Sequence, residues 1–510
     1  MKKLVTLIGF ALVCGLLIIP SGGALAADLV VAVDSPPRTM DPGGSLADPN
    51  LSVMGNIFDP LMSLEGPEGK LSPALAESFE HPDLLTWKFN LRKGVKFTNG
   101  NDFNAADVVF TMNRLSDPKC CSEFLDFGKS LASVEAPDDY TVVIKTKSPV
   151  PYFPTRLNNV SIVDKESSEG RDVGDMGLNP IGTGAYKLVE WVKGSFLKLT
   201  ANENYWRGAP AIKNIEIRPI TEASTRFAAL VSGKVDLMSG VPVELFDKVS
   251  KNPKIQIFSR PARRTIFLML SNKEGTPTAD LRVRQAMYMA INQNEIIEKI
   301  MRGHASPAAQ LADSAMVGFN AKIARPAHDP DKAKALLKEA GFADGFEITL
   351  AGPNDRYVQD EKIAEAVVKY LAKVGIKAKL DVKPKAAYFP EVVGAKHQFC
   401  LLGWLDSTYD YGRTFSDLVH THDKETGAGT WNGVRFSSPE LDKMMVEANK
   451  IADVDKRRAA LEALNAEAMD QVAIIPLHNG VNLYAAQKAK NINFVPRADR
   501  WLLYREISFK

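Results

Sequence analysis

The residues whose types and spacing could do chemistry begin with His420 and His422. In a strand, side chains two positions apart face the same side, so these two imidazoles could share a metal ion. However, no third ligand stands nearby in the sequence, and the segment that follows, 423–429 (DKETGAG), has the composition of a loop. We therefore expect a solvated loop here, and we expect neither a metal nor a cofactor in the protein.

Familiar catalytic and nucleotide-binding motifs are missing from the sequence. It contains no G-x-x-x-x-G-K-[ST] phosphate loop, no H-E-x-x-H zinc motif and no G-x-S-x-G nucleophile motif. Gly182-Thr183-Gly184 lacks the third glycine of a dinucleotide fingerprint. The pattern of motifs therefore gives no positive sign of an enzyme.

The cysteines that remain once a leader is set aside are Cys120, Cys121 and Cys400. An odd number leaves at least one thiol free or paired between chains. Cys120 and Cys121 could form a vicinal disulfide, but we expect two thiols in a loop after Asp117-Pro118. Without a C-x-x-C pair, neither zinc binding nor thioredoxin-like chemistry is indicated.

The elements that must position any functional residue alternate between strands and helices along the whole chain. Short apolar or alternating runs predict strands, and Trp87, Phe89 and Leu91 would share the buried face of one of them. The predicted strands are 29–33, 87–91, 141–145, 197–199, 212–220 and 376–382.

Helices are clearest in the second half of the chain. Asp329-Pro330 and Ser438-Pro439 each combine a capping side chain with a proline suited to the first turn. Residues 281–300 read as helix in two pieces, with Asn294 capping the second. Residues 357–373 predict a further helix that ends before Gly375.

Composition and charge exclude several classes of protein. The chain has 510 residues, 45% apolar and 24% charged, which is ample for a folded core and too apolar for a disordered protein. Without Lys2 and Lys3, the 61 remaining basic residues equal the 61 acidic ones. A neutral chain has no electrostatic footprint for nucleic acid or for anionic membranes.

The N-terminus has the pattern of a secretory signal peptide over residues 1–26. Lys2 and Lys3 precede an apolar run from Leu4 to Ile19, and a small-residue site ends at Ala26. The apolar run is shorter than the roughly 20 residues that a membrane span needs. We expect export to the periplasm with cleavage near Ala26. An exported, neutral α/β chain without a catalytic motif fits a solute-binding protein better than a hydrolase.

Several segments in order along the chain carry a family resemblance. They are Leu75–Phe79, Trp87–Phe97, Phe103–Phe110, Asn179–Tyr186, Thr225–Asp236, Val283–Asn292 and Ala473–Leu477. Together they resemble the family 5 extracellular solute-binding proteins, which are the dipeptide, oligopeptide and nickel-binding components of ABC importers. These segments are structural, so they identify the family better than they identify a ligand.

The resemblance implies an α/β, two-lobed periplasmic-binding-protein-like fold of type II, in its large three-subdomain variant, with the ligand cleft at the hinge. A signal peptide would occupy 1–26. Lobe I would comprise 28–60, 180–270 and 485–510, with an extra subdomain from 61–179, and lobe II would comprise 271–484. Closure of the lobes would enclose the ligand, and the closed form would dock on an inner-membrane ABC permease.

In the peptide-binding members of the family, a Gly-Trp pair is followed closely by an Asp, and this Asp meets the ammonium group of the peptide. The resemblance therefore implies a ligand role for the segment after Trp404. Here Ser407 stands three residues after Trp404, where the dipeptide binders have that Asp, so the sequence departs from their pattern. Asp406 is one residue early and Asp410 matches a later acidic position. We name both as ligand-binding candidates, with the capping of a turn as the alternative, and Trp404 either stacks on the ligand or supports the loop.

Other candidates for the ligand site lie in predicted loops. Relatives place a basic residue near Arg356 against the ligand carboxylate, which Arg356 could bind through two hydrogen bonds, and the alternative is a surface role. Trp431 and Asn432 belong to a loop that would line the cleft, with Arg435 as another anion partner. The loop 35–42 follows the first strand at the end where open α/β sheets bind ligands.

The sequence therefore predicts a periplasmic binding protein, not an enzyme, that takes a peptide or a similar small polar solute. A nickel chelate, an opine or an oligosaccharide is the alternative ligand, and His420 or His422 in the cleft would favour the chelate. An exported hydrolase and a structural or chaperone-like envelope protein are the alternatives from other classes. We expect a monomer that contacts its ligand and a permease, and no nucleic acid.

Overall fold

The computed structural model describes residues 27–171 and 173–510, so the predicted signal peptide lies outside the described residues. Within them, the largest sheet has 11 strands in the order β15-β14-β16-β12-β17-β11-β1-β10-β9-β8, with β13 paired to β17. The strands are β1 (Leu29–Val33), β8 (Tyr186–Val192), β9 (Phe196–Ala201), β10 (Asn214–Pro219), β11 (Leu237–Ser239), β12 (Ile255–Leu270), β13 (Ala305–Pro307), β14 (Glu347–Pro353), β15 (Lys377–Lys383), β16 (Phe399–Trp404) and β17 (Ile474–Gln487).

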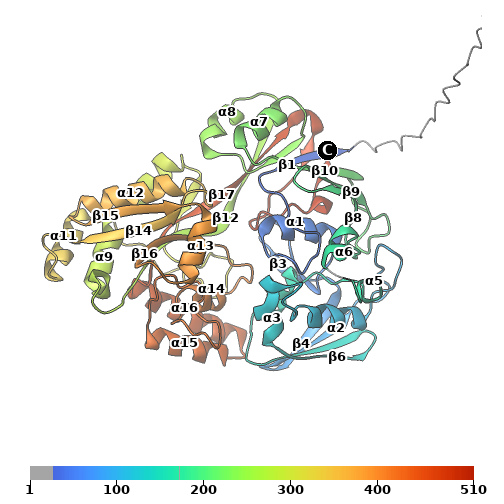
Figure 1. Ribbon diagram of the computed structural model, residues 1–510, viewed down its shortest axis with the longest axis horizontal. Helices are drawn as coiled ribbons and strands as arrows, with labels where there is room; N and C mark the ends of the chain where they lie inside the picture. Colours follow the sequence, from blue (N-terminus) through green and yellow to red (C-terminus); the bar gives the residue numbers. More distant parts are fainter. Residues whose placement is uncertain (1–26, 172) are drawn as a thin grey trace, which may run out of the picture.

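Two long strands at the centre of this sheet connect two lobes. β12 and β17 pair antiparallel from Ile255–Gln487 to Met269–Ile474, with a shift of register between Pro261 and Thr265. At one end β17 pairs with β11 of lobe I, and at the other β12 pairs with β16 of lobe II. Figure 1 shows these two strands running between the two halves of the molecule. They therefore form the hinge.

Lobe I is built on β1 and β8–β11, and β1 pairs parallel with both β10 and β11. Its helices are α1 (Asp48–Ile57), α7 (Ala223–Val231) and α8 (Phe246–Ser250), and β18 (Ile492–Asn493) and β19 (Ser508–Phe509) pair near the C-terminus.

A further part of lobe I, drawn in light blue and cyan in Figure 1, contains a four-stranded sheet in the order β4-β5-β7-β6. Trp87, Phe89 and Leu91 are buried in its core, as predicted. Its elements are β2 (Met62–Glu65), β3 (Lys70–Pro73), β4 (Ala76–Asp83), β5 (Thr86–Leu91), α2 (Ala105–Arg114), α3 (Leu125–Ser130), β6 (Leu131–Asp138), β7 (Thr141–Thr146), α4 (Phe153–Arg156), α5 (Lys165–Ser168) and α6 (Val173–Leu178).

Lobe II is built on β14, β15 and β16, which are flanked by helices. Its largest apolar core also includes Phe227 and Val249 of α7 and α8, which the predicted boundary at 270 assigns to lobe I. The division into lobes at these residue numbers stays a prediction. The helices are α9 (Leu281–Ala290), α10 (Gln293–Glu295), α11 (Pro330–Glu339), α12 (Asp360–Ala372), α13 (Lys385–Val393), α14 (Tyr411–Leu418), α15 (Pro439–Asn449) and α16 (Val454–Asp470).

The local signals for helix starts are confirmed at two of the predicted helices and are wrong at another. Asp329 and Ser438 accept hydrogen bonds from Lys332 N and Leu441 N, as expected of capping residues. The second piece of the helix over 281–300 is capped by Asn292, which accepts from Glu295 N, and not by Asn294. The first piece, α9, ends at Ala290, and Asn294 lies inside α10.

The cysteine prediction is also corrected. Cys120 and Cys121 form a vicinal disulfide, because the turn after Asp117-Pro118 brings their sulfur atoms together, and Cys400 is a buried free thiol. Among the described helices, none is both long and apolar enough to cross a membrane.

Candidate functional site

A cavity of about 390 Å³ lies against the hinge, which is a volume within the range of small-molecule sites. Both lobes contribute to its wall. Lobe I supplies Asp34, which follows β1, the segment 240–244 and Arg500, whereas lobe II supplies the segment 355–359 and Leu405. β12 and β17 complete the wall, in part through Arg264, Ile266, His478 and Tyr484.

Two of the arginines in this wall are held by acidic partners. Arg500 Nη2 donates to Asp34 Oδ2 at 2.8 Å, and Arg264 Nη2 donates to Asp48 Oδ2 of α1 at 3.2 Å. Burial alone would raise the pKa of Asp34, but the attraction and hydrogen bond of Arg500, together with the charge of Arg226, lower that pKa below its ordinary value. Asp34 therefore carries a negative charge at neutral pH.

Arg264 lies in the positive field of its neighbours. Burial lowers the pKa of its guanidinium, Asp48 opposes this shift, and Arg356 and Arg500 add to it. Because cations repel each other at short range, this side of the cavity favours a ligand that carries negative charge.

Arg356 reaches the cavity from the loop between β14 and α12. Its backbone N–H and that of Tyr357 both donate to Asp360 at 2.9 Å, and Tyr357 Oη donates to Gly403 O at 3.1 Å. The loop is thus anchored at both ends, while the exposed Arg356 side chain has no hydrogen-bond or ion-pair partner among the described residues. Its guanidinium lies 5.4 Å from the centre of the Tyr357 ring.

The two predicted ammonium partners are occupied by bonds within the protein. Asp406 is 6% exposed and accepts from Thr408 N, Thr408 Oγ1 and Thr414 Oγ1. Asp410 accepts from Gly412 N as the cap of α14 and binds Arg457 through both oxygens, at 2.5 and 2.9 Å. Neither residue lines the cavity, so their carboxylates brace the loop between β16 and α14. Their ligand role stays an untested prediction without support from this geometry.

The remaining predicted residues also lie outside the cavity wall. Trp404 and Trp431 are half-buried and pack on each other, with ring centres 5.9 Å apart. Asn432 is fully buried and donates to the carbonyls of Val419, His420 and Phe436, so it holds its own loop together. Arg435 likewise donates to carbonyls of Gly429, Asn432 and Val393.

The histidine pair forms part of the loop between α14 and α15. His420 Nδ1 lies 2.7 Å from Thr421 O, and neither His420 nor His422 lines the cavity. In the described part of the chain, no three His, Cys, Asp or Glu side chains are grouped so that they could hold a metal ion.

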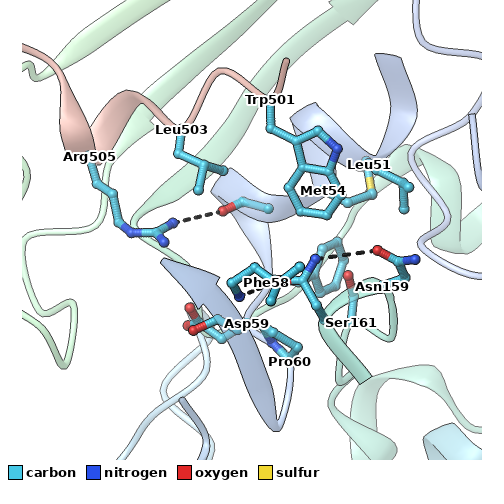
Figure 2. Close-up of a pocket in the computed structure, with 14 residues that line it drawn as sticks. Leu51, Met54, Phe58, Asp59, Pro60, Asn159, Ser161, Trp501, Leu503 and Arg505 are labelled. Atoms are coloured by element: carbon cyan, nitrogen blue, oxygen red, sulfur yellow. Dashed lines mark hydrogen bonds between the residues drawn. The ribbon is translucent and has the colours of Figure 1, made fainter. Parts of the chain in front are cut away.

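Two other hollows lie in the described part of the chain. Figure 2 shows one within lobe I, between Leu51, Met54, Trp501 and Leu503, where Arg505 Nη1 donates to Gly55 O at 3.3 Å. Its volume of about 20 Å³ suits at most a single water molecule. The other, of about 400 Å³, contains Asp313, which accepts a hydrogen bond from Arg263 Nε, and Glu68, which pairs with Arg260. Arg263 Nη1 and Nη2 are buried and have no hydrogen-bond partner among the described residues.

Sequence reasoning missed Asp34, Glu244, Arg264 and Arg500 as cavity residues. The loop 35–42 after the first strand was predicted to meet the ligand, and Asp34 directly precedes that loop. Arg264 precedes the apolar run of β12, and a charged residue entering a buried strand was a usable signal. No local sequence pattern points to Glu244 or Arg500, because the fold places them in the cavity wall together with residues that are distant in the sequence.

Comparison with known proteins places this geometry in context. A family model described as bacterial extracellular solute-binding proteins, family 5, matches residues 70–425. The glutathione-binding protein GsiB of Pectobacterium atrosepticum is 30% identical over 459 residues, covering 88% of this chain and 87% of that protein. The GsiB of Shigella flexneri is 29% identical and covers 89% of each chain.

Solved structures agree with the fold. The periplasmic binding protein DppA of Helicobacter pylori, in complex with the peptide STSA, has a TM-score of 0.79 and 26% identity, covering 94% of this chain and 98% of that one. HbpA2 of Haemophilus parasuis has a TM-score of 0.83 at 24% identity, covering 94% and 99%, and that likeness concerns the fold alone. The predicted two-lobed binding-protein fold is confirmed.

Proposed function

Because this chain belongs to the bacterial extracellular solute-binding proteins of family 5, we propose that it captures a peptide or a similar small polar solute between its lobes and delivers it to an ABC permease. The observation that carries the proposal is the hinge cavity of about 390 Å³, whose wall both lobes share. A ligand that touches both lobes stabilises the closed form over the open one, which gives a permease a signal of loading.

The ligand contacts that we propose centre on Arg356. Among the described residues, Arg356 is the arginine of the cavity wall that has no acidic partner. Its guanidinium is therefore free to bind a ligand carboxylate through two hydrogen bonds. We leave Asp406, Asp410 and Asn432 out of the proposed contacts because their polar atoms are already bonded within the protein.

We propose an exported, periplasmic monomer that binds its ligand without turning it over. The neutral charge balance and the leader-like residues 1–26 support export without membrane or nucleic-acid attachment.

Native mass spectrometry of the protein, purified from its own envelope without refolding, tests the proposal. A ladder of small bound masses that resolve into short peptides is the expected result. A single metal-containing adduct or a sugar would keep the binding function and replace the ligand class. Incubation of the bound species with the protein should yield no product, and observed turnover would contradict the proposal.

A further inference from the structure

Two polar contacts join the lobes outside the hinge cavity. Arg413 Nη2 of α14 lies 3.5 Å from Asp126 Oδ2 of α3, and the side chain of Asn159, which follows α4, donates to Ser407 Oγ at 3.0 Å. None of these four residues lines the hinge cavity. Figure 1 shows α14 and α3 at the facing edges of the two halves of the molecule, below the long strands β12 and β17 that connect them. The two contacts therefore bridge the lobes at a place separate from the cavity wall.

Each partner of the charged contact is already paired within its own lobe. Asp126 accepts a hydrogen bond from Arg156 Nη2 of α4 at 2.5 Å, and Arg413 Nε donates to Asp417 Oδ2, one turn along α14, at 2.7 Å. Burial alone would raise the pKa of Asp126, but the attraction of both arginines and the hydrogen bonds that this carboxylate accepts lower it below its ordinary value. Asp126 therefore carries a negative charge at neutral pH and attracts an arginine from each lobe.

We propose that the ion pair between Arg413 and Asp126, together with the hydrogen bond from Asn159, is a latch that holds the lobes closed and retains a captured solute. This inference rests on the proposed function, in which closure captures the solute, and it adds contacts that belong to the protein alone. When the lobes open, Asp126 keeps Arg156 as its partner. Arg413 keeps Asp417 in the same way, so opening leaves neither charge alone. The latch is therefore reversible, as release of the solute to a permease requires.

The loop between β16 and α14 positions the latch on lobe II. Asp410 caps α14, the helix that carries Arg413, and Asp406 accepts three hydrogen bonds from within the loop and α14. In the same loop, the Tyr409 hydroxyl approaches lobe I so closely that a methyl group added at Gly69 would overlap it. The two carboxylates that the sequence suggested for a ligand ammonium therefore hold the loop in the shape that meets lobe I.

The expected strength of the latch follows from its exposure to water. The side chains of Arg413 and Asp126 are 27% and 54% exposed. An ion pair of this exposure changes the ratio of closed to open molecules by about two- to fivefold. Dissolved salt screens such a pair, so closure should depend on ionic strength even when no charged solute is present.

Single-molecule fluorescence energy transfer measures the ratio of closed to open molecules in the absence of a solute. The dyes are attached to the full chain through E135C on β6 and K443C on α15, which are exposed positions on the two lobes. For the labelled parent we expect a closed population in about 20 mM salt that decreases in about 500 mM salt. D126N and R413Q should each lower the closed-to-open ratio about two- to fivefold, mainly through faster opening, and should lose most of the salt dependence.

E190Q in the same labelled chain is the matched control. Glu190 and Lys198 lie 2.8 Å apart and are 48% and 30% exposed, close to the values in the latch, but both belong to lobe I. The closed-to-open ratio of E190Q should therefore equal that of the labelled parent. The double variant D126N/R413Q should lower the ratio no further than either single variant, because both changes remove the same ion pair.

Three results would overturn the latch: D126N and R413Q closing like the parent, an equal decrease in E190Q, or a parent without a closed population in the low-salt buffer. Because the assay contains no solute, none of these results bears on whether the native protein carries one. A solute found by mass spectrometry would then leave the proposed function standing. Turnover of that solute would instead contradict the proposed function and leave the latch intact.

Discussion

Replacing Asp410 by asparagine separates a structural role for this carboxylate from a ligand role. The side chains of Asp410 and Arg457 are 5% and 6% exposed, and two bonds join them. D410N keeps an oxygen that can cap α14 but leaves Arg457 charged, buried and unpaired. Removing one partner of a buried ion pair costs about 3–5 kcal/mol. At about 2–4 °C per kcal/mol for an unfolding unit of 150–250 residues, the melting temperature should fall by roughly 6–20 °C.

The assay is thermal unfolding followed by circular dichroism, with the ligand affinity of each variant measured in parallel. E447Q provides a matched control, because Glu447 and Lys450 lie 2.7 Å apart but are 58% and 59% exposed, and its melting temperature should not change measurably. The double variant D410N/R457M should lose less stability than the two single variants together, since it removes the lone buried charge. A D410N melting temperature within about 2 °C of wild type, together with a large loss of ligand affinity, would refute the structural reading and restore the ammonium-binding one.

Three further predictions follow from other parts of the structure. G69A should weaken ligand binding at least tenfold in calorimetry, because the added methyl group overlaps the hydroxyl of Tyr409, which reaches lobe I from lobe II. G66A is the control: Gly66 has nearly the same positive φ, but a methyl group added there meets open space, so the affinity should stay close to wild type. Burial raises the pKa of Asp107 to about 6, so the native state binds a proton more tightly than the unfolded chain, and ionisation costs stability as the pH rises from about 4 to 6. Melting curves should therefore show that D107N gains relative to wild type over this interval, and a constant difference would contradict the argument. Burial lowers the pKa of His478 to about 4, so stability is lost as the pH falls from about 6.5 to 4, and H478N should lose less over that interval than wild type does.

How much of the fold the sequence could predict depends on how local each signal is. The starts of α11 and α15 are set by Asp329, Ser438 and the prolines after them, and these were correctly placed. The start of α12 was placed three residues early, at Tyr357, because the deciding contact is made by Asp360, which holds the preceding loop through two backbone N–H groups. That contact keeps Arg356 outside the helix and exposed in the cavity wall.

The candidate site was less predictable because its residues are selected by pairing across long distances in the sequence. Asp34 and Arg500 are separated by 466 positions, and Asp48 and Arg264 by 216. No local pattern tells which charged residue will find a partner. The same limit explains Asp406 and Asp410, whose spacing from Trp404 suggested a ligand contact, while Thr414 and Arg457 supply their partners within the fold.

The residues that place the chain in its family therefore differ from the residues that select its ligand. The segments that carry the family resemblance are largely core: Trp87 and Phe89 are at most 3% exposed, and neither approaches the hinge cavity. Substituting them would change stability before it changed specificity. We propose that selection of a ligand depends instead on the side chains of the cavity wall, above all on charges that folding leaves without a partner there. In the described residues Arg356 is the arginine of that wall without an acidic partner, so a change of its charge should redirect specificity while the family fold is kept.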